Sequence, residues 1–146
     1  MDTFNSVEEI LDYAISNEEE SSEFYSYLAK QIDNPELKRI LNTFAHEEEA
    51  HKKKLIMAKK GIINLIPDKN IIDLNKNDYL VADSAHPKMD ISDALRLAIK
   101  KEKAVFNLYM TMAQRTYDEK HRKMFILLAQ EEAKHKEKFE DELSTL

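Results

Sequence analysis

The 146-residue sequence contains no cysteine and no tryptophan, and it has only one glycine and three prolines. The absence of cysteine excludes disulfides, cysteine-ligated zinc, iron–sulfur clusters and cysteine nucleophiles. The scarcity of glycine and proline, together with abundant Glu, Lys, Leu and Ala, favours long helices over β-sheet. The chain is long enough to bury one core, so we expect a single all-α domain over residues 1–146.

Long apolar runs and an excess of basic residues are also missing. No apolar run approaches the length that spans a membrane. The 28 acidic and 22 basic residues are finely interspersed and give a formal charge of −6, which argues against a nucleic-acid surface. The acidic N-terminus lacks the positive start and apolar stretch of a signal peptide. We therefore expect a soluble cytoplasmic protein that binds neither membrane nor nucleic acid.

The main positive feature of the sequence is an internal repeat. Shifting the chain by 84 residues aligns residues 10–55 with residues 94–139 without a gap, which predicts a duplicated pair of helices. The polar pairs that this shift superposes are Glu18 and Glu102, Tyr25 and Tyr109, Glu48 and Glu132, and His51 and His135.

Capping residues set the limits of these helices. Ser6, Asn34, Asp90 and Asp118 are each suited to an N-cap. Gly61, the only glycine, lies where the second helix should end. The predicted helices lie near residues 6–32, 35–60, 91–116 and 119–143, and the tight links within each pair indicate two antiparallel hairpins.

Residues 62–89 form a connection that is longer than ordinary bundle loops. Apolar Ile and Leu residues occur there among Asn, Asp and Pro67. We interpret the segment as a long crossover packed along the bundle, with a short helix in it. The alternative is a dimer contact or a swapped hairpin, which a link of this length permits.

Acidic residues occupy positions of the helices where core residues are expected. In the first helix, Glu18 lies one heptad from both Leu11 and Tyr25, on the stripe that a bundle helix buries. Four carboxylates at one depth of the bundle would repel one another, and an unpaired buried charge is costly. Two divalent cations would neutralise them. The sequence thus predicts a metal site with the ligands Glu18, Glu48, His51, Glu102, Glu132 and His135.

The ligand types suit iron. Glu at position i and His at i+3 lie about 60° apart around a helix, so both can reach one ion. Mixed oxygen and imidazole ligands favour iron or manganese, whereas calcium prefers oxygen alone. One Glu from each of two helices and Glu-x-x-His from each of the others is the pattern of di-iron carboxylate bundles. We expect two iron ions per chain, with manganese or a mixed pair as the alternative.

Four segments carry a resemblance to a known family. AISNEEESSEFYSYLAK and LNTFAHEEEAHKKKL in the first half, and LAIKKEKAVFNLYMTMAQ and LLAQEEAKHKEKF in the second, resemble the diiron motif of rubrerythrins, members of the ferritin-like superfamily. The resemblance covers both hairpins and not residues 62–89, and it implies a ferritin-like antiparallel four-helix bundle. It also implies that Glu48 and Glu132 bridge the metals, that Glu18 and Glu102 are terminal ligands, and that His51 and His135 complete the set.

The sequence departs from the rubrerythrin pattern in two ways. Many rubrerythrins add a rubredoxin domain with four cysteines, and this chain has no cysteine. Many also carry an extra glutamate three residues after the third-helix ligand, where this chain has Val105, matched by Ser21 in the first half. The first departure implies an external electron donor, and the second a more symmetric site.

Other polar residues near the motif have simpler interpretations. Tyr25 and Tyr109 lie two turns, about 10 Å, beyond Glu18 and Glu102, and we interpret them as phenols hydrogen-bonded to a ligand carboxylate. The alternative is a core tyrosine whose hydroxyl is satisfied elsewhere. The remaining residues that we expect to be solvated, lysine-paired or otherwise ordinary are Glu47, Glu131, His46, His86 and His121.

The leading hypothesis is a diiron protein that reduces hydrogen peroxide with electrons from a separate protein. The first alternative is iron handling, with ferroxidation by dioxygen, storage or delivery, which the symmetric site favours. The second is a metal-stabilised interaction module that works through residues 62–89, and oxygenase or manganese chemistry is a further one. A homodimer is expected.

Overall fold

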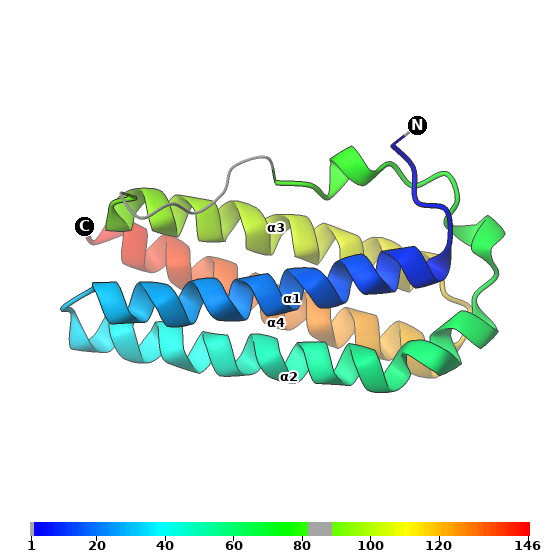
Figure 1. Cartoon of the computed structure of the whole chain (residues 1–146), viewed down its shortest axis with the longest axis horizontal. Helices are drawn as coiled ribbons and strands as arrows, with labels where there is room; N and C mark the ends of the chain where they lie inside the picture. Colours follow the sequence, from blue (N-terminus) through cyan, green and yellow to red (C-terminus); the bar gives the residue numbers. More distant parts are fainter. Residues whose placement is uncertain (1, 82–88) are drawn as a thin grey trace.

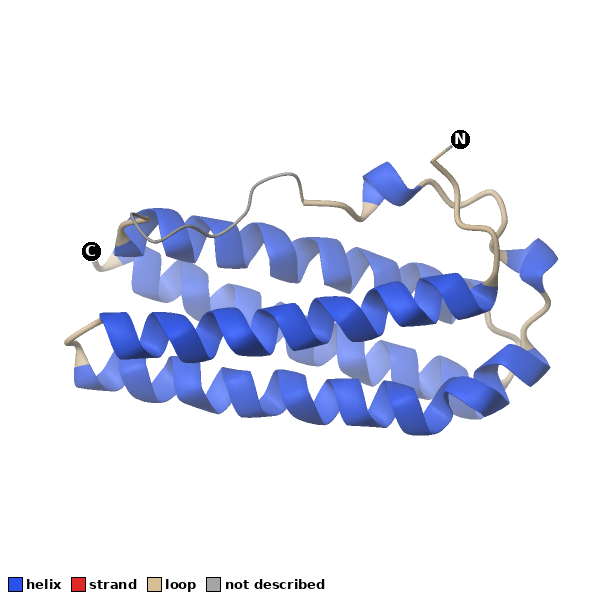
Figure 2. Ribbon diagram, in the orientation of Figure 1, coloured by secondary structure: helices blue, strands red, loops and turns tan. Residues whose placement is uncertain are grey.

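The structure is a computed structural model that describes residues 2–81 and 89–146. The described residues form four long helices: α1 (Val7–Gln31), α2 (Pro35–Leu65), α3 (Ile91–Arg115) and α4 (Glu119–Ser144). They contain no strand, although an isolated bridge joins Thr3 and Asn75, and helix dominates the molecule (Figure 2). The prediction of an all-α four-helix bundle is confirmed.

The helices pack as two hairpins, α1 against α2 and α3 against α4. Figure 1 shows that α1 and α4 run in one direction and that α2 and α3 run in the other. Equivalent helices of the two repeats, α1 with α3 and α2 with α4, therefore face each other antiparallel. This arrangement relates the two halves of the chain by an approximate two-fold rotation.

All four predicted N-caps are present. The Ser6 hydroxyl accepts the Glu9 N–H at 3.0 Å, and the Asp90 carboxylate accepts the Asp93 N–H at 2.8 Å. The side chains of Asn34 and Asp118 cap α2 and α4 in the same way. Because a cap is a local interaction, the sequence placed every helix start within one residue.

The predicted end of the second helix was wrong. α2 passes through Gly61, whose φ is not positive, and continues to Leu65, two residues before Pro67. The extra turn is held by burial, since Ile62 is fully buried and Ile66, the C-cap, is nearly so. A Cβ added at Gly61 would lie 3.4 Å from the His121 ring. Gly61 therefore lies beside the imidazole of α4, inside the helix, and does not stop it.

The described part of the connection packs along the bundle, as predicted, and contains two short 3₁₀ helices, η1 (Asp68–Asn70) and η2 (Lys76–Asp78). Asp68 accepts the Val7 N–H at 2.9 Å, and the Tyr13 hydroxyl donates to the Tyr79 carbonyl at 2.9 Å. These contacts tie the connection to α1. The dimer contact and the swapped hairpin stay hypotheses, and His86 lies outside the described residues.

The core consists of two apolar clusters separated by a polar layer. Leu11, Leu55 and Phe125 belong to one cluster, and Leu41 and Phe139 belong to the other. Along each helix the predicted Glu and His ligands lie between residues of the two clusters. In the part of the chain that the structure describes, no helix combines the length and the apolar character that a membrane crossing requires.

Candidate metal centre

The six predicted ligands lie together in the polar layer. Each of the four helices contributes one glutamate, and α2 and α4 each add a histidine one turn later. All six side chains are buried, with no residue more than 2% exposed. The residues concerned are Glu18 from α1, Glu48 and His51 from α2, Glu102 from α3, and Glu132 and His135 from α4.

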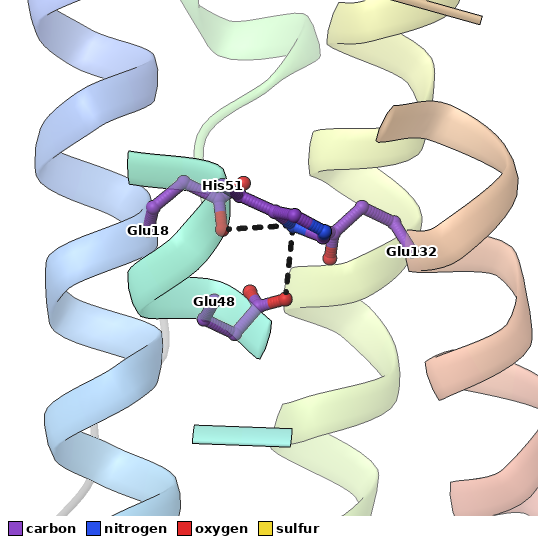
Figure 3. Close-up of side chains that lie close together, drawn as sticks. All are labelled: Glu18, Glu48, His51 and Glu132. Atoms are coloured by element: carbon purple, nitrogen blue, oxygen red, sulfur yellow. Dashed lines mark hydrogen bonds and ion pairs between the residues drawn. The ribbon is translucent and has the colours of Figure 1, made fainter. Parts of the chain in front are cut away.

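These residues form two overlapping groups that could each hold a metal ion. One consists of Glu18, Glu48, His51 and Glu132, and Figure 3 shows these side chains converging. The other consists of Glu48, Glu102, Glu132 and His135. In each group, one potential ligand atom per residue lies within 4.8 Å of all the others. Glu48 and Glu132 belong to both groups, so two neighbouring positions share two carboxylates.

The two histidines form one side of the cluster and present Nδ1 to it. His51 Nδ1 lies 2.7 Å from Glu132 Oε1 and 3.5 Å from Glu18 Oε2. His135 Nδ1 lies 3.1 Å from Glu48 Oε1. The two rings are nearly parallel, with centroids 6.2 Å apart. Each imidazole can therefore offer Nδ1 as a ligand.

Without a metal ion, protonation of the buried carboxyl and imidazole groups offsets the negative charge of the cluster. Burial and repulsion from Glu48 raise the pKa of Glu18 to about 8, and burial and the nearby Glu102 raise the pKa of Glu132 well above its usual range. Burial lowers the pKa of His51, but its contacts with Glu18 and Glu48 outweigh this and raise it to about 10. A bound cation would replace these protons, since metal ligands must be deprotonated.

Several buried ligand atoms have no hydrogen-bond partner in the described part of the chain. Among them are Glu18 Oε2, Glu102 Oε2 and Glu132 Oε2. A buried acceptor without a partner costs free energy, more so when it is charged. Four carboxylates and two imidazoles are also a donor set suited to iron or manganese. The residues present therefore fit a pair of divalent cations.

Two buried tyrosines donate hydrogen bonds to Glu18 and Glu102, the outer glutamates, which each belong to one of the two groups only. The Tyr25 hydroxyl of α1 donates to Glu102 Oε1 of α3, and the Tyr109 hydroxyl of α3 donates to Glu18 Oε1 of α1. Burial, followed by the charge of Glu102, raises the pKa of Tyr25 well above its usual value. The phenol therefore stays protonated and remains a donor. The sequence suggested such hydrogen bonds but did not indicate that they cross between hairpins.

Glu47 and Glu131 are partly solvated, as expected, with side chains 47% and 45% exposed. Their contacts with the candidate histidine ligands were not expected. Glu131 Oε2 contacts Nε2 of His51, and Glu47 Oε2 lies 2.5 Å from Nε2 of His135. The 84-residue repeat superposes Glu47 and Glu131 as well, and that was the signal in the sequence that could have identified them. His46 and His121 lie outside both groups.

Two hollows flank the centre. One of about 440 Å³ lies between α2 and α4 and is lined by both histidines together with Glu47 and Glu131. The other, of about 200 Å³, lies over α1 and α3 and is covered by Tyr79 of the connection. It is lined by Ser21 and Val105, the residues three positions after Glu18 and Glu102. Ser21 and Val105 are themselves buried and lie between this hollow and the candidate ligands, none of which lines it.

Comparison with known proteins agrees with the geometry. A family model described as Rubrerythrin matches residues 9–143 and so includes both hairpins, the connection and all six candidate ligands. No curated protein and no solved structure matches the chain significantly.

Proposed function

Because the chain belongs to the rubrerythrin family, we propose that its six buried carboxylate and imidazole residues bind two iron ions. The observation that carries the proposal is the pair of overlapping groups that share Glu48 and Glu132. Shared carboxylates would hold two cations side by side, and four carboxylates would balance the charge of two divalent ions. In this arrangement Glu18 and His51 would belong to one ion and Glu102 and His135 to the other, with Glu48 and Glu132 shared.

The activity that we propose is the reduction of hydrogen peroxide to water by electrons from an external donor protein. Peroxide takes up two electrons and two protons, its O–O bond breaks, and two water molecules form. A bound iron pair would supply the two electrons, one from each ion. A donor protein would then restore them, since this chain has no cysteine for an electron-transfer centre of the rubredoxin type.

The residues of the chain bind and orient the reactants in this scheme. Because His51 and His135 occupy the α2/α4 side of the centre, we propose that a small oxidant approaches from the α1/α3 side. The hollow lined by Ser21 and Val105 lies on that side. The apolar clusters on both sides of the polar layer keep bulk water away from the centre. Tyr25 and Tyr109 fix the outer carboxylates.

A second candidate is ferrous iron oxidation by dioxygen, followed by iron delivery. The feature that favours it is Val105, which lies where an additional glutamate ligand would have to be. A site that lacks this ligand keeps two similar halves, each with one outer glutamate and one histidine. Iron would then be the substrate and would leave after oxidation.

Rapid-mixing experiments distinguish the two proposed functions. Protein loaded anaerobically with ferrous iron is mixed with peroxide in one experiment and with dioxygen in another, and the absorbance of the oxidised centre is followed. A peroxidase gives much faster oxidation by peroxide, retains two iron ions per chain, and is reduced again by a small electron-transfer protein. Faster oxidation by dioxygen with loss of iron supports the second candidate. Failure to bind iron would refute both.

A further inference from the structure

Each candidate histidine ligand is held from both sides by the facing helix. Consecutive residues of α4, Glu131 and Glu132, contact the two nitrogens of His51: Glu132 lies 2.7 Å from Nδ1, and Glu131 contacts Nε2. Successive residues of a helix project about 100° apart, so two neighbouring carboxylates can reach the two edges of one ring.

The other half of the chain repeats this arrangement. Glu47 and Glu48 are consecutive residues of α2, and they contact the two nitrogens of His135 on α4. Glu48 lies 3.1 Å from Nδ1, and Glu47 lies 2.5 Å from Nε2. Because α2 and α4 are antiparallel, each pair of glutamates reaches the histidine of the other hairpin.

The two glutamates of each pair have different surroundings. The side chains of Glu48 and Glu132 are fully buried, whereas those of Glu47 and Glu131 are 47% and 45% exposed. The histidine side chains are only 2–3% exposed. Each imidazole therefore separates the buried cluster from solvent, with a half-exposed carboxylate on its outer edge. The two histidines and their outer glutamate partners line the 440 Å³ hollow, together with Lys54 and Lys134.

The outer hydrogen bond determines what the inner nitrogen can do. A neutral imidazole carries one proton, and the nitrogen without it is the one that can bind a metal. A carboxylate that accepts the Nε2 hydrogen keeps the proton on that nitrogen, fixes the ring orientation and strengthens Nδ1 as a ligand. Two half-exposed carboxylates placed on the outer edges of both rings would serve both metal positions in the same way.

We propose that Glu131 and Glu47 are positioning residues that hold the Nε2 hydrogens of His51 and His135, so that each histidine binds metal only with the help of the opposite hairpin. The inference rests on the proposed metal centre and adds to it two residues outside the ligand set. It also explains why each repeat reads Glu-Glu-x-x-His: the first glutamate positions the facing histidine, and the second is a shared ligand.

Substitution of the two glutamates tests the inference with zinc and cobalt(II), which need no redox activity. The variants are Glu131→Leu and Glu47→Leu, which remove the acceptor, and Glu131→Gln and Glu47→Gln, whose amide oxygen can still accept. Glu23→Gln on the exposed face of α1 is the charge-matched control. Competition titrations measure the affinity, and ¹⁵N NMR of the imidazoles in the zinc-loaded protein identifies the protonated nitrogen.

We expect Glu131→Leu to weaken binding at the position that contains His51 by about 10- to 100-fold and to leave the other position nearly unchanged. Glu47→Leu should weaken binding at the position that contains His135 instead. The glutamine variants should lose less metal affinity than the leucine variants, and Glu23→Gln should bind metal as the wild type does. In the wild-type protein, Nε2 of both rings should carry the hydrogen. If a leucine variant does not fold, as judged from its helical circular dichroism, the matching alanine variant, which also lacks the acceptor, gives the same comparison of affinities and imidazole shifts.

Two results would overturn the inference in distinguishable ways. If the wild type binds two metal ions and the leucine variants bind them equally tightly with unchanged imidazole nitrogen shifts, the positioning role is wrong and the metal centre stands. If the wild type binds no metal ion, the proposed function fails and the positioning role with it.

Discussion

Tyr25 on α1 donates its hydroxyl hydrogen bond to Glu102 on α3, so a phenol of one hairpin holds a carboxylate of the other. Both side chains are buried, and the same relationship joins Tyr109 to Glu18 in the opposite direction. Each tyrosine also belongs to the apolar cluster on its own side of the polar layer. The two hydrogen bonds therefore connect the metal centre to the hydrophobic packing above and below it.

Removal of these hydroxyls should destabilise the protein and weaken metal binding. In Tyr25→Phe, a buried carboxylate oxygen of Glu102 loses its donor, which should cost about 1–3 kcal/mol of unfolding free energy. Tyr109→Phe should have a similar cost through Glu18. Urea denaturation of the metal-free proteins measures the effect, and Tyr27→Phe, whose side chain is well exposed, is the control. Equal stabilities for all three variants would show that the hydrogen bonds contribute nothing.

Shared and outer glutamates should differ in the number of metal ions that they support. Glu132 belongs to both candidate groups and Glu102 to one. We expect Glu132→Gln to impair both positions, whereas Glu102→Gln should leave the position with His51 able to bind. Elemental analysis after loading with zinc gives the metal content per chain. A Glu132→Gln variant that still binds two ions tightly would contradict the bridging role.

The metal-free protein should become less stable as the pH rises from mildly acidic to alkaline. The pKa of Glu18 is raised from 4.5 to about 8 and that of His51 from 6.5 to about 10, so the folded state binds more protons than the unfolded state over this range. Stability therefore falls with increasing pH. Glu48 acts oppositely under acid conditions, because its pKa is lowered to about 2 despite its burial, through contacts with His135 and His51.

Urea midpoints measured near pH 6 and near pH 9 in the presence of a chelator test this dependence, and the midpoint should be lower at the higher pH. Addition of zinc should reverse the trend, because cation binding releases protons and strengthens as the pH rises. A midpoint that increases with pH in the chelator would show that the buried carboxylates are not protonated in the metal-free fold.

Gly61→Ala should stabilise the protein. Gly61 lies inside α2 with an ordinary helical backbone, where alanine is preferred over glycine by about 0.5–1 kcal/mol. The new methyl group would meet the His121 ring at 3.4 Å, which is close packing that the ring can accommodate. Gly61→Leu should destabilise, since a larger side chain would collide with the ring. Thermal unfolding distinguishes the two, and a destabilised alanine variant would indicate that the imidazole cannot move.

The helix starts could be predicted because their causes are local. Ser6, Asn34, Asp90 and Asp118 each accept a backbone N–H two or three residues ahead, and that interaction does not depend on the rest of the fold. The end of α2 depends on tertiary packing instead. Ile62 and Ile66 bury themselves against the core, and this burial outweighs the low helix propensity of Gly61.

The sequence by itself determined the helical repeat and the six candidate ligands, because heptad spacing places a glutamate or histidine on the buried stripe of every helix. Only the tertiary structure decided the contacts between hairpins: Tyr25 with Glu102, and Glu131 with His51. The repeat specifies two similar hairpins but not how they face each other. Their antiparallel association fixes which residues meet across the centre, and that geometry is absent from the spacing within any one helix.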